Sequence, residues 1–424
     1  MFAEKENNHA LFINPIKSEK LLVICSDAAC PPPRFNLFKK AQILGVNVLF
    51  LNTTPNKWYR TGIDSISDEM KEKDGIKAFK SYMDKIKKKY DITRTYFMGF
   101  SMGAYGALLL GSVVNSDSVL FISGEPVLGI PGGKTERTRN RYWHLHSDLR
   151  SVSVKKVISI FGTLDIADNI GAYLVQSCSP SCLQYSLSYA EHDLTERINE
   201  RGLLDAILKD FVSDRLENID STFTRETVSK EFFDYLMILN EYINKKDYPK
   251  IEYIIEKQKD KWLDRAPLVK FILVVAFKKQ GKIAEARKYL YELIDIEPRF
   301  YKYWNLLASI LREEKQYESA LVAIDVAIAL RPRISLSLHI KSIILKEQKQ
   351  YAKALFYGER AVEINSKIEM YSENVKKLRK HLNDSPHLLV PYTEIYNDGF
   401  EGSQVIKRLQ EAKSILGLNF ELKI

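Results

Sequence analysis

A serine between two glycines marks the stretch MGFSMGAYGA, residues 98–107. Ser101 has Gly99 two residues before it and Gly103 two residues after it. A β-rich run precedes the serine and an apolar helical pattern follows it. A hydroxyl at such a strand-to-helix turn is exposed, and it becomes a nucleophile when a neighbouring base removes its proton. Ordinary glycine-rich turns look similar, so the residues further along the chain must decide.

Two later segments carry the acid and the base that such a nucleophile needs. Asp165 follows the apolar run at 155–162, and Asp168 comes three residues later as a second candidate acid. His192 follows the run at 183–190. An Asp at a strand end can also cap a helix, and a loop histidine can simply be solvated. Because a carboxylate that orients an imidazole makes a serine reactive, we predict a triad of Ser101, His192 and Asp165, with Asp168 as the alternative acid.

Short apolar runs alternate with amphipathic stretches throughout the first half of the chain. Runs dense in Val, Ile, Leu, Phe and Tyr are typical of strands that are buried on both faces. Their alternation with helical segments predicts a mostly parallel sheet with helices on both sides. The runs are residues 20–26, 46–52, 93–99, 118–123, 155–162 and 183–190.

The segments GFSMGA, FGTLD and EHD, in this order, resemble the α/β-hydrolase superfamily over residues 19–215. The resemblance implies an oxyanion hole made of two backbone N–H groups. One belongs to Met102, the residue after the nucleophile, and the other to Asp27 or Ala28 in the loop after the first main strand. The HGGG form of this loop, which many lipases have, is absent here.

Two loops are candidates for substrate contact. Residues 52–63 include Trp58, Tyr59 and Arg60, which suit a sugar ring or an anionic group but equally suit a structural anchor. The stretch 124–150 stands where α/β-hydrolases insert a lid. It is rich in glycine, proline and arginine, which favours a polar substrate over an apolar one that would need an apolar binding tunnel.

The second half of the chain is helical and repeats with a fixed period. Ala286, Ala320 and Ala354 follow one another at intervals of 34 residues, and so do Pro298 and Pro332. This spacing resembles the tetratricopeptide (TPR) repeat, in which small residues let paired helices approach and proline ends the second helix. We therefore expect an α/β-hydrolase domain followed by an all-α TPR-like solenoid. The predicted segments are an N-terminal extension at 1–18, the hydrolase domain at 19–215, a helical linker or degenerate repeat at 216–265, three repeats at 266–368 and a helical cap at 369–424.

The composition limits the partners. The formal net charge is +9 over 424 residues, with no arginine-rich arm and no nucleic-acid motif, so we expect no nucleic acid as partner. No apolar run approaches the length of a membrane span. The first residues lack an apolar leader pattern, and the cysteines are too few for a disulfide framework, so we predict a cytoplasmic protein with free thiols.

These features predict a serine acyl-transfer enzyme that forms an acyl-enzyme. Water as the acceptor would make it an esterase, and a sugar hydroxyl would make it an O-acetyltransferase that acts on a glycan-linked substrate. We expect no bound cofactor and no metal, with acetyl-CoA as a co-substrate in the transferase case. The repeats are expected to bind a protein partner or to mediate self-association. The alternative is a non-catalytic TPR scaffold with a degenerate hydrolase domain.

Overall fold

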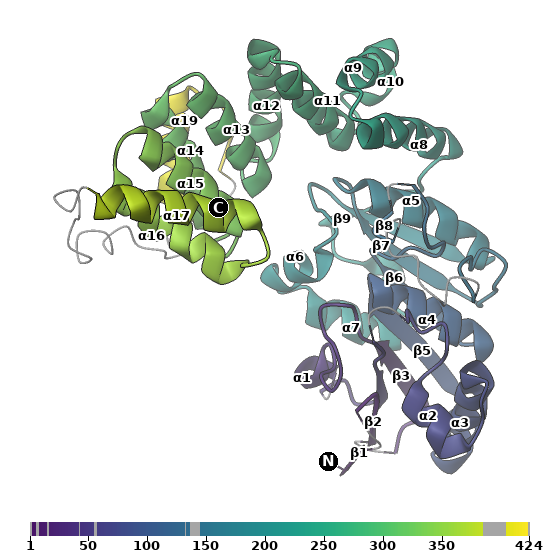
Figure 1. The fold of residues 1–424 in the computed structure, drawn as a ribbon. Helices are drawn as coiled ribbons and strands as arrows, with labels where there is room; N and C mark the ends of the chain where they lie inside the picture. The colour runs from purple at the N-terminus through teal and green to yellow at the C-terminus, as the bar shows by residue number, and fades with distance from the viewer. Residues whose placement is uncertain are drawn as a thin grey trace. The chain divides into compact units, whose positions relative to one another are not determined.

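The computed structural model divides into two compact units, Met1–Asp247 and Tyr248–Ile424 (Figure 1). Each unit has its own core and is described by itself. The described residues are 2–5, 8–14, 17–41, 43–54, 57–131, 133–135, 145–384 and 404–422.

The first unit contains a nine-stranded sheet with the order β1-β2-β4-β3-β5-β6-β7-β8-β9. The strands from β4 through β8 in this order run parallel to one another. The pairs β1–β2, β2–β4 and β8–β9 are antiparallel, and β1 and β9 are the edge strands. The sequence prediction of a mostly parallel sheet is confirmed. The strands are Phe2–Lys5, Ala10–Asn14, Lys20–Cys25, Asn47–Leu51, Arg94–Phe100, Ser118–Ile122, Val157–Gly162, Cys182–Leu187 and Phe223–Arg225, for β1 to β9 in chain order.

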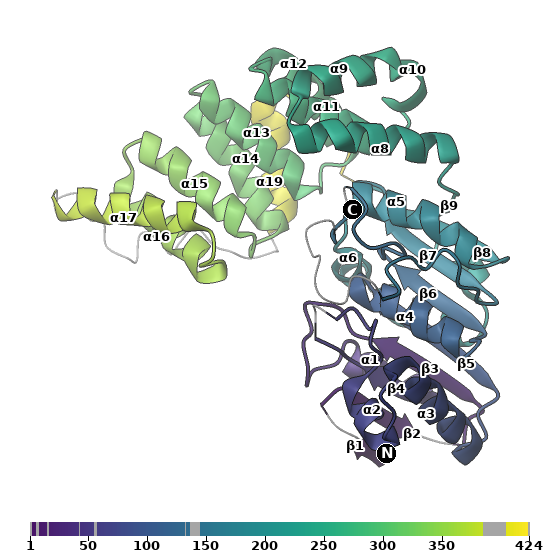
Figure 2. The same cartoon turned by 45° about the vertical axis from the view of Figure 1, so that its right-hand side comes forward.

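The sheet is buried on both faces because helices cover both. In β3, Leu21 and Val23 belong to one apolar core, whereas Leu22 and Ile24 belong to the other. One face is covered by α2 (Asp64–Met70), α3 (Gly75–Lys89) and α4 (Met102–Val113), as Figure 2 shows. The other face carries α1, α6 and α7. Their bounds are Phe38–Ala41, Leu194–Glu200 and Leu204–Val212.

The first unit extends beyond the predicted hydrolase segment at both ends. Residues 1–18, predicted as an extension, contribute β1 and β2 to the sheet. Beyond residue 215, β9 pairs with β8, and α8 (Lys230–Lys245) packs against α5 (Ile166–Val175). Phe233 on α8 stacks on Tyr173 of α5 with ring centroids 4.3 Å apart. Aromatic burial and strand pairing therefore tie this segment to the sheet.

The second unit is built from helix pairs that repeat every 34 residues. Its repeated helices are α11 (Pro267–Lys279), α12 (Ile283–Ile296), α13 (Tyr301–Glu313), α14 (Tyr317–Leu330), α15 (Ser335–Glu347), α16 (Tyr351–Ile364) and α17 (Glu369–Asn383). The alanines at 286, 320 and 354 are fully buried, which lets the paired helices approach closely. Two shorter helices, α9 (Tyr248–Lys257) and α10 (Lys259–Trp262), precede the repeats. The predicted TPR-like arrangement is confirmed.

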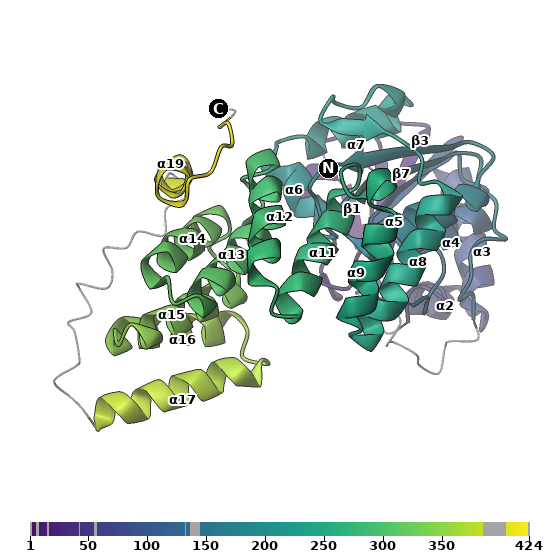
Figure 3. The same ribbon diagram turned by 90° about the horizontal axis from the view of Figure 1, so that it is seen from above.

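The last helix does not lie where a terminal cap would. Helix α17 packs against α16, but α19 (Val405–Leu416) packs against α14, in the middle of the repeats (Figure 3). Phe420 meets the ring of the buried Trp304 edge-on, and Asn419 donates its backbone N–H to Asp295. The aromatic contact with α13 and the hydrogen bond to α12 thus hold the tail to the first two repeat pairs, so the tail is no end cap.

Among the described residues, no helix combines the length and the apolar character that a membrane crossing requires.

Candidate active site

Ser101 occupies a strained turn between β5 and α4. Its φ of 52° and ψ of −118° lie outside the regions that non-glycine residues ordinarily adopt. A Cβ on Gly99 would lie 2.1 Å from the backbone carbon of Gly103, and a Cβ on Gly103 would lie 2.2 Å from the carbonyl oxygen of Cys25. Only glycine fits these two positions, because α4 starts directly against β5 and β3. The turn presents the serine hydroxyl at the carboxyl edge of the sheet.

Three side chains that follow parallel strands of the sheet form one hydrogen-bonded chain at this edge. Ser101 Oγ lies 2.8 Å from His192 Nε2, and His192 Nδ1 lies 2.7 Å from Asp168 Oδ1. The serine follows β5, the aspartate lies at the start of α5 after β7, and the histidine follows β8. Asp168 is buried, and its second oxygen accepts hydrogen bonds from the hydroxyl of Ser123 and the backbone N–H of Gly162. The carboxylate is thereby held in one orientation.

The acid that contacts the histidine is Asp168, the second candidate, and not Asp165. Asp165 is the N-cap of α5, where its Oδ1 accepts the backbone N–H of Asp168 at 3.1 Å. Its Oδ2 pairs with Lys134 Nζ at 2.6 Å. The preference for Asp165 is therefore corrected. The N–H of Asp168 and the ammonium of Lys134 occupy the two carboxylate oxygens of Asp165. The side chain of Asp168, three residues later, contacts the imidazole instead.

The environment of His192 favours its protonated form. Burial alone would lower the pKa of the imidazole, but the hydrogen bond and the negative charge of Asp168, helped by the charge of Asp165, outweigh it. The net effect raises the pKa of His192 above its ordinary value of 6.5. A histidine whose imidazolium is stabilised in this way is suited to accept a proton from Ser101 during a reaction.

The loop after β3 runs beside the serine. Cys25, the last residue of β3, is paired in register with Gly99 of β5, so Asp27 and Ala28 follow on the side where Ser101 emerges. Met102 is the first residue of α4, and the backbone N–H at that position has no acceptor within its own helix. This placement suits the predicted oxyanion hole, whose donors stay a prediction.

Trp58, Tyr59 and Arg60 are buried and do not present their side chains to a substrate. Their exposed fractions are 9%, 0% and 2%. The Tyr59 hydroxyl donates to the carbonyl oxygens of Ser26 at 2.8 Å and Leu51 at 3.2 Å. The assignment of these three residues as substrate contacts is corrected in favour of the structural alternative, because Tyr59 bonds to the ends of β3 and β4.

Three residues that the sequence did not single out support the site. The hydroxyl of Ser123 donates a hydrogen bond to Asp168, and the ammonium of Lys134 donates one to Asp165. Glu125 is buried, and it accepts hydrogen bonds from the backbone of Lys134 and from the Thr135 hydroxyl at 2.7 Å. Burial raises the pKa of Glu125 despite the hydrogen bonds from Thr135 and Lys134. Glu125, Lys134 and Thr135 belong to the stretch 124–150, of which 132 and 136–144 lie outside the described residues.

One cluster in the described part of the chain brings donor atoms close enough to hold a metal ion. Asp165, Asp168 and His192 each place one such atom within 4.8 Å of the others. Each residue already has a protein partner here, because Asp168 binds His192, His192 binds Ser101, and Asp165 binds Lys134. The three side chains are therefore held by contacts within the protein.

The sheet order, the strained serine turn and the chain order of serine, acid and histidine define the first unit as an α/β-hydrolase fold. The 34-residue helix pairs define the second unit as a TPR-like repeat domain.

Several solved structures are similar to parts of this chain. The capsule O-acetyltransferase of Neisseria meningitidis serogroup A is 16% identical and has a TM-score of 0.35. The match covers 48% of this chain and 92% of the acetyltransferase chain. Est1E from Butyrivibrio proteoclasticus is 12% identical, covers 49% with 94% of its own chain, and has a TM-score of 0.31. A thermophilic TPR protein from Thermus thermophilus is 15% identical, covers 42% with 97% of its own chain, and has a TM-score of 0.32.

No model of a known protein family matches the chain, and no curated protein sequence matches it.

Proposed function

We propose that this protein is a serine acyl-transfer enzyme with Ser101 as nucleophile, His192 as general base and Asp168 as the acid that orients the histidine. The observation that carries the proposal is the unbroken hydrogen-bonded chain from Ser101 Oγ through His192 to Asp168. Its position at the carboxyl edge of a parallel sheet, next to the start of α4, supports the same assignment.

The reaction follows from this geometry. Ser101 Oγ attacks an acyl carbonyl while His192 Nε2 takes the hydroxyl proton, and Asp168 stabilises the imidazolium that forms. The backbone N–H of Met102, together with that of Asp27 or Ala28, stabilises the oxyanion. His192 then returns the proton to the leaving group, and the acyl-enzyme remains on Ser101. Water or a hydroxyl acceptor, activated by the same histidine, releases the acyl group.

A fluorophosphonate probe tests the nucleophile directly. We expect the probe to label the wild-type chain covalently and to leave Ser101→Ala unlabelled, because the probe reacts only with an activated serine. Ser112→Ala is the matched control, since Ser112 lies in the same helix and its hydroxyl only bonds the carbonyl of Leu109. A correctly folded wild-type chain that resists the probe would contradict the proposal and favour the non-catalytic scaffold.

We expect the rate of labelling to rise with pH. The reaction needs neutral His192, whose pKa is raised above 6.5 by Asp168 and Asp165 against the opposing effect of burial. We therefore expect the rate constant to be highest above that pKa and to fall as the pH drops through it. Labelling rates measured from about pH 5 to about pH 9 test this expectation. A rate that stays constant over this range would show that no histidine controls the step.

The proposal also concerns the substrate and the group that accepts the acyl chain. We propose a polar, glycan-linked substrate, supported by the glycine- and arginine-rich character of residues 124–150. In the transferase case acetyl-CoA would be the co-substrate. Measuring ester hydrolysis beside acetyl-CoA consumption, with and without a polysaccharide acceptor, separates the two cases. Consumption that requires the polysaccharide indicates a transferase, and hydrolysis that ignores it indicates an esterase.

A further inference from the structure

Two carboxylates, not one, lie close to the imidazole of His192. One atom each of Asp165, Asp168 and His192 lies within 4.8 Å of the other two. Both acids are shielded from water, with 13% of the Asp165 side chain and 1% of the Asp168 side chain exposed. Two such carboxylates repel each other and compete for the same imidazole unless a cation neutralises one of them.

Lys134 supplies that cation. Its ammonium lies 2.6 Å from Oδ2 of Asp165. Oδ1 of the same carboxylate accepts the backbone N–H of Asp168 at 3.1 Å, so each oxygen of Asp165 is engaged. Removal of the ammonium would release Oδ2, while the backbone hydrogen bond would keep the carboxylate beside His192. Asp165 is therefore placed to act as a second acid as soon as its ion pair is lost.

A buried carboxylate fixes the backbone that carries Lys134. Glu125 accepts hydrogen bonds from the backbone N–H of Lys134 and from Thr135, whose hydroxyl lies 2.7 Å and whose N–H lies 3.3 Å from Oε2. The Thr135 hydroxyl also accepts the N–H of Gly129 at 2.7 Å. A lysine loses much conformational entropy when it forms an ion pair, which makes most exposed pairs weak. Fixing its backbone beside Asp165 reduces this cost.

The ion pair also changes the charge that acts on His192. The charged groups that reach the imidazole include Asp168 and Asp165 from α5 and Lys134 and Glu125 from the stretch after β6. Burial lowers the pKa of His192, the two aspartates raise it above its ordinary value, and Lys134 opposes the aspartates. Without the ammonium, more of the imidazole would be protonated at neutral pH, and an imidazolium cannot act as a base.

We propose that Lys134 is a positioning residue that keeps Asp165 away from His192, so that Asp168 alone orients the imidazole, and that Asp165 can replace Asp168 once the ammonium is gone. The inference rests on the proposed function, because it concerns the same serine, histidine and acid. It predicts that a substitution at Lys134 makes a chain without Asp168 faster.

A double-mutant cycle on the fluorophosphonate labelling rate tests the second acid. We expect Asp168→Ala to label about 10⁴-fold more slowly than the wild type. Adding Lys134→Met to that chain should raise its rate at least about tenfold. Alanine leaves space into which Oδ2 of Asp165 can turn, and the N–H of residue 168 still holds Oδ1. Adding Lys134→Arg should restore nothing, because arginine keeps a cation on Asp165. A rate that falls or stays unchanged on adding Lys134→Met would overturn the proposal.

The pH profile of Lys134→Met gives a second readout in a chain that keeps Asp168. Because the pKa of His192 should rise, the pH of half-maximal labelling should move up by about one pH unit. Lys134→Arg should keep the wild-type midpoint. So should Lys155→Met, the matched control, since Lys155 pairs with Asp117 at 2.9 Å at the amino ends of β6 and β7, away from the site. An unchanged or lower midpoint in Lys134→Met would contradict the proposal.

A histidine titration separates failure of this inference from failure of the proposed function. In the Ser101→Ala chain, NMR of carbon-13-labelled histidine gives the pKa of His192, whose signal is the one lost in His192→Gln. A wild-type chain that resists the fluorophosphonate would overturn the proposed function, yet Lys134→Met should still raise this pKa. If the wild type is labelled and Lys134→Met leaves the pKa unchanged, the inference about Lys134 fails and the proposed function stands.

Discussion

Asp168→Asn is expected to lower the rate constant of fluorophosphonate labelling by about 10⁴-fold. The asparagine amide cannot stabilise an imidazolium, and its NH₂ group would favour the wrong tautomer of His192, whose Nδ1 now lies 2.7 Å from a carboxylate oxygen. The protein should stay folded, because Ser123 Oγ and the N–H of Gly162 can still bond the side-chain oxygen. Labelling time courses on the variant and the wild type measure the effect.

Asp165→Asn is the matched control for this prediction. Asparagine caps helices as well as aspartate does, so the hydrogen bond to the N–H of Asp168 should persist. The variant loses the ion pair with Lys134 and one negative charge near His192, which should slow labelling by no more than about tenfold. If Asp165→Asn slowed the reaction as much as Asp168→Asn, the acid would have to be assigned to Asp165 again.

Gly103→Ala is expected to have the second large effect, on stability and labelling together. The added Cβ would lie 2.2 Å from the carbonyl oxygen of Cys25 and 3.1 Å from the backbone carbon of Ser26. Backbone atoms of a central strand cannot move aside, so α4 must shift and carry Ser101 and Met102 with it. We expect a loss of about 3 kcal/mol in the free energy of unfolding and a strong loss of labelling. Urea unfolding and the probe measure the two effects.

Gly111→Ala in the same helix controls for the substitution itself. The nearest atoms to a Cβ at Gly111 belong to side chains, with Ser116 Oγ at 2.9 Å, and that hydroxyl can rotate away. Alanine also favours a helix interior over glycine by about 1 kcal/mol. We expect nearly unchanged stability and wild-type labelling. Equal stability of Gly103→Ala and Gly111→Ala would show that the close contact between α4 and β3 is unimportant.

Local sequence patterns predicted much of this protein because they depend on neighbours in the chain. The alternation of apolar runs with helical stretches predicted the parallel sheet, and the 34-residue spacing of alanines predicted the helix pairs. The glycines around Ser101 predicted the strand-to-helix turn. The position of His192 after the last parallel strand placed it at the same edge of the sheet, because parallel strands end together.

The choice between Asp165 and Asp168 depended on the tertiary structure. The two residues are three apart at the start of one helix, so sequence places both near His192. The cap of α5 and the ammonium of Lys134, which comes from a distant loop, take up the oxygens of Asp165. Ser123 at the end of another strand orients Asp168 toward the imidazole. Contacts between residues far apart in the chain decide which carboxylate is available.

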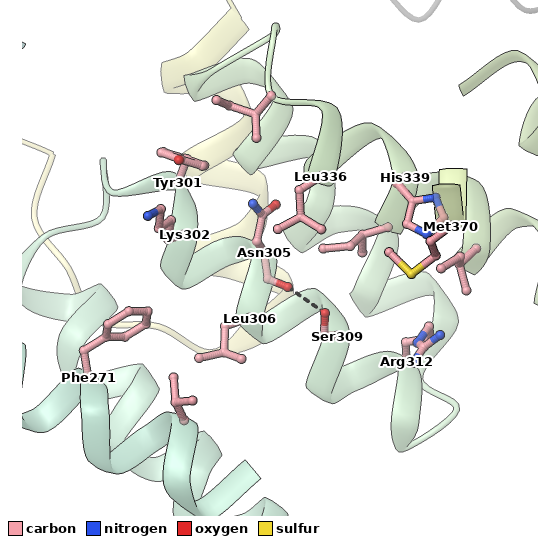
Figure 4. A pocket seen from close by; sticks show the side chains of 14 residues that line it. Phe271, Tyr301, Lys302, Asn305, Leu306, Ser309, Arg312, Leu336, His339 and Met370 are labelled. Atoms are coloured by element: carbon pink, nitrogen blue, oxygen red, sulfur yellow. Dashed lines mark hydrogen bonds between the residues drawn. The ribbon is translucent and has the colours of Figure 1, made fainter. Parts of the chain in front are cut away.

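The sequence by itself therefore determined the class of sheet and the repeat period, and it predicted that Ser101 and His192 would lie at the same edge of the sheet. Only the tertiary structure decided which carboxylate contacts His192, the burial of Trp58 and Tyr59, and the packing of the tail helix on α14. It also decided the cavity around Asn305 and His339, whose lining comes from the helices α11, α13, α15 and α17 (Figure 4). The physical reason is the same in each case: propensity and periodicity act between near neighbours, whereas burial and hydrogen-bond partners are set by segments that meet only in the fold.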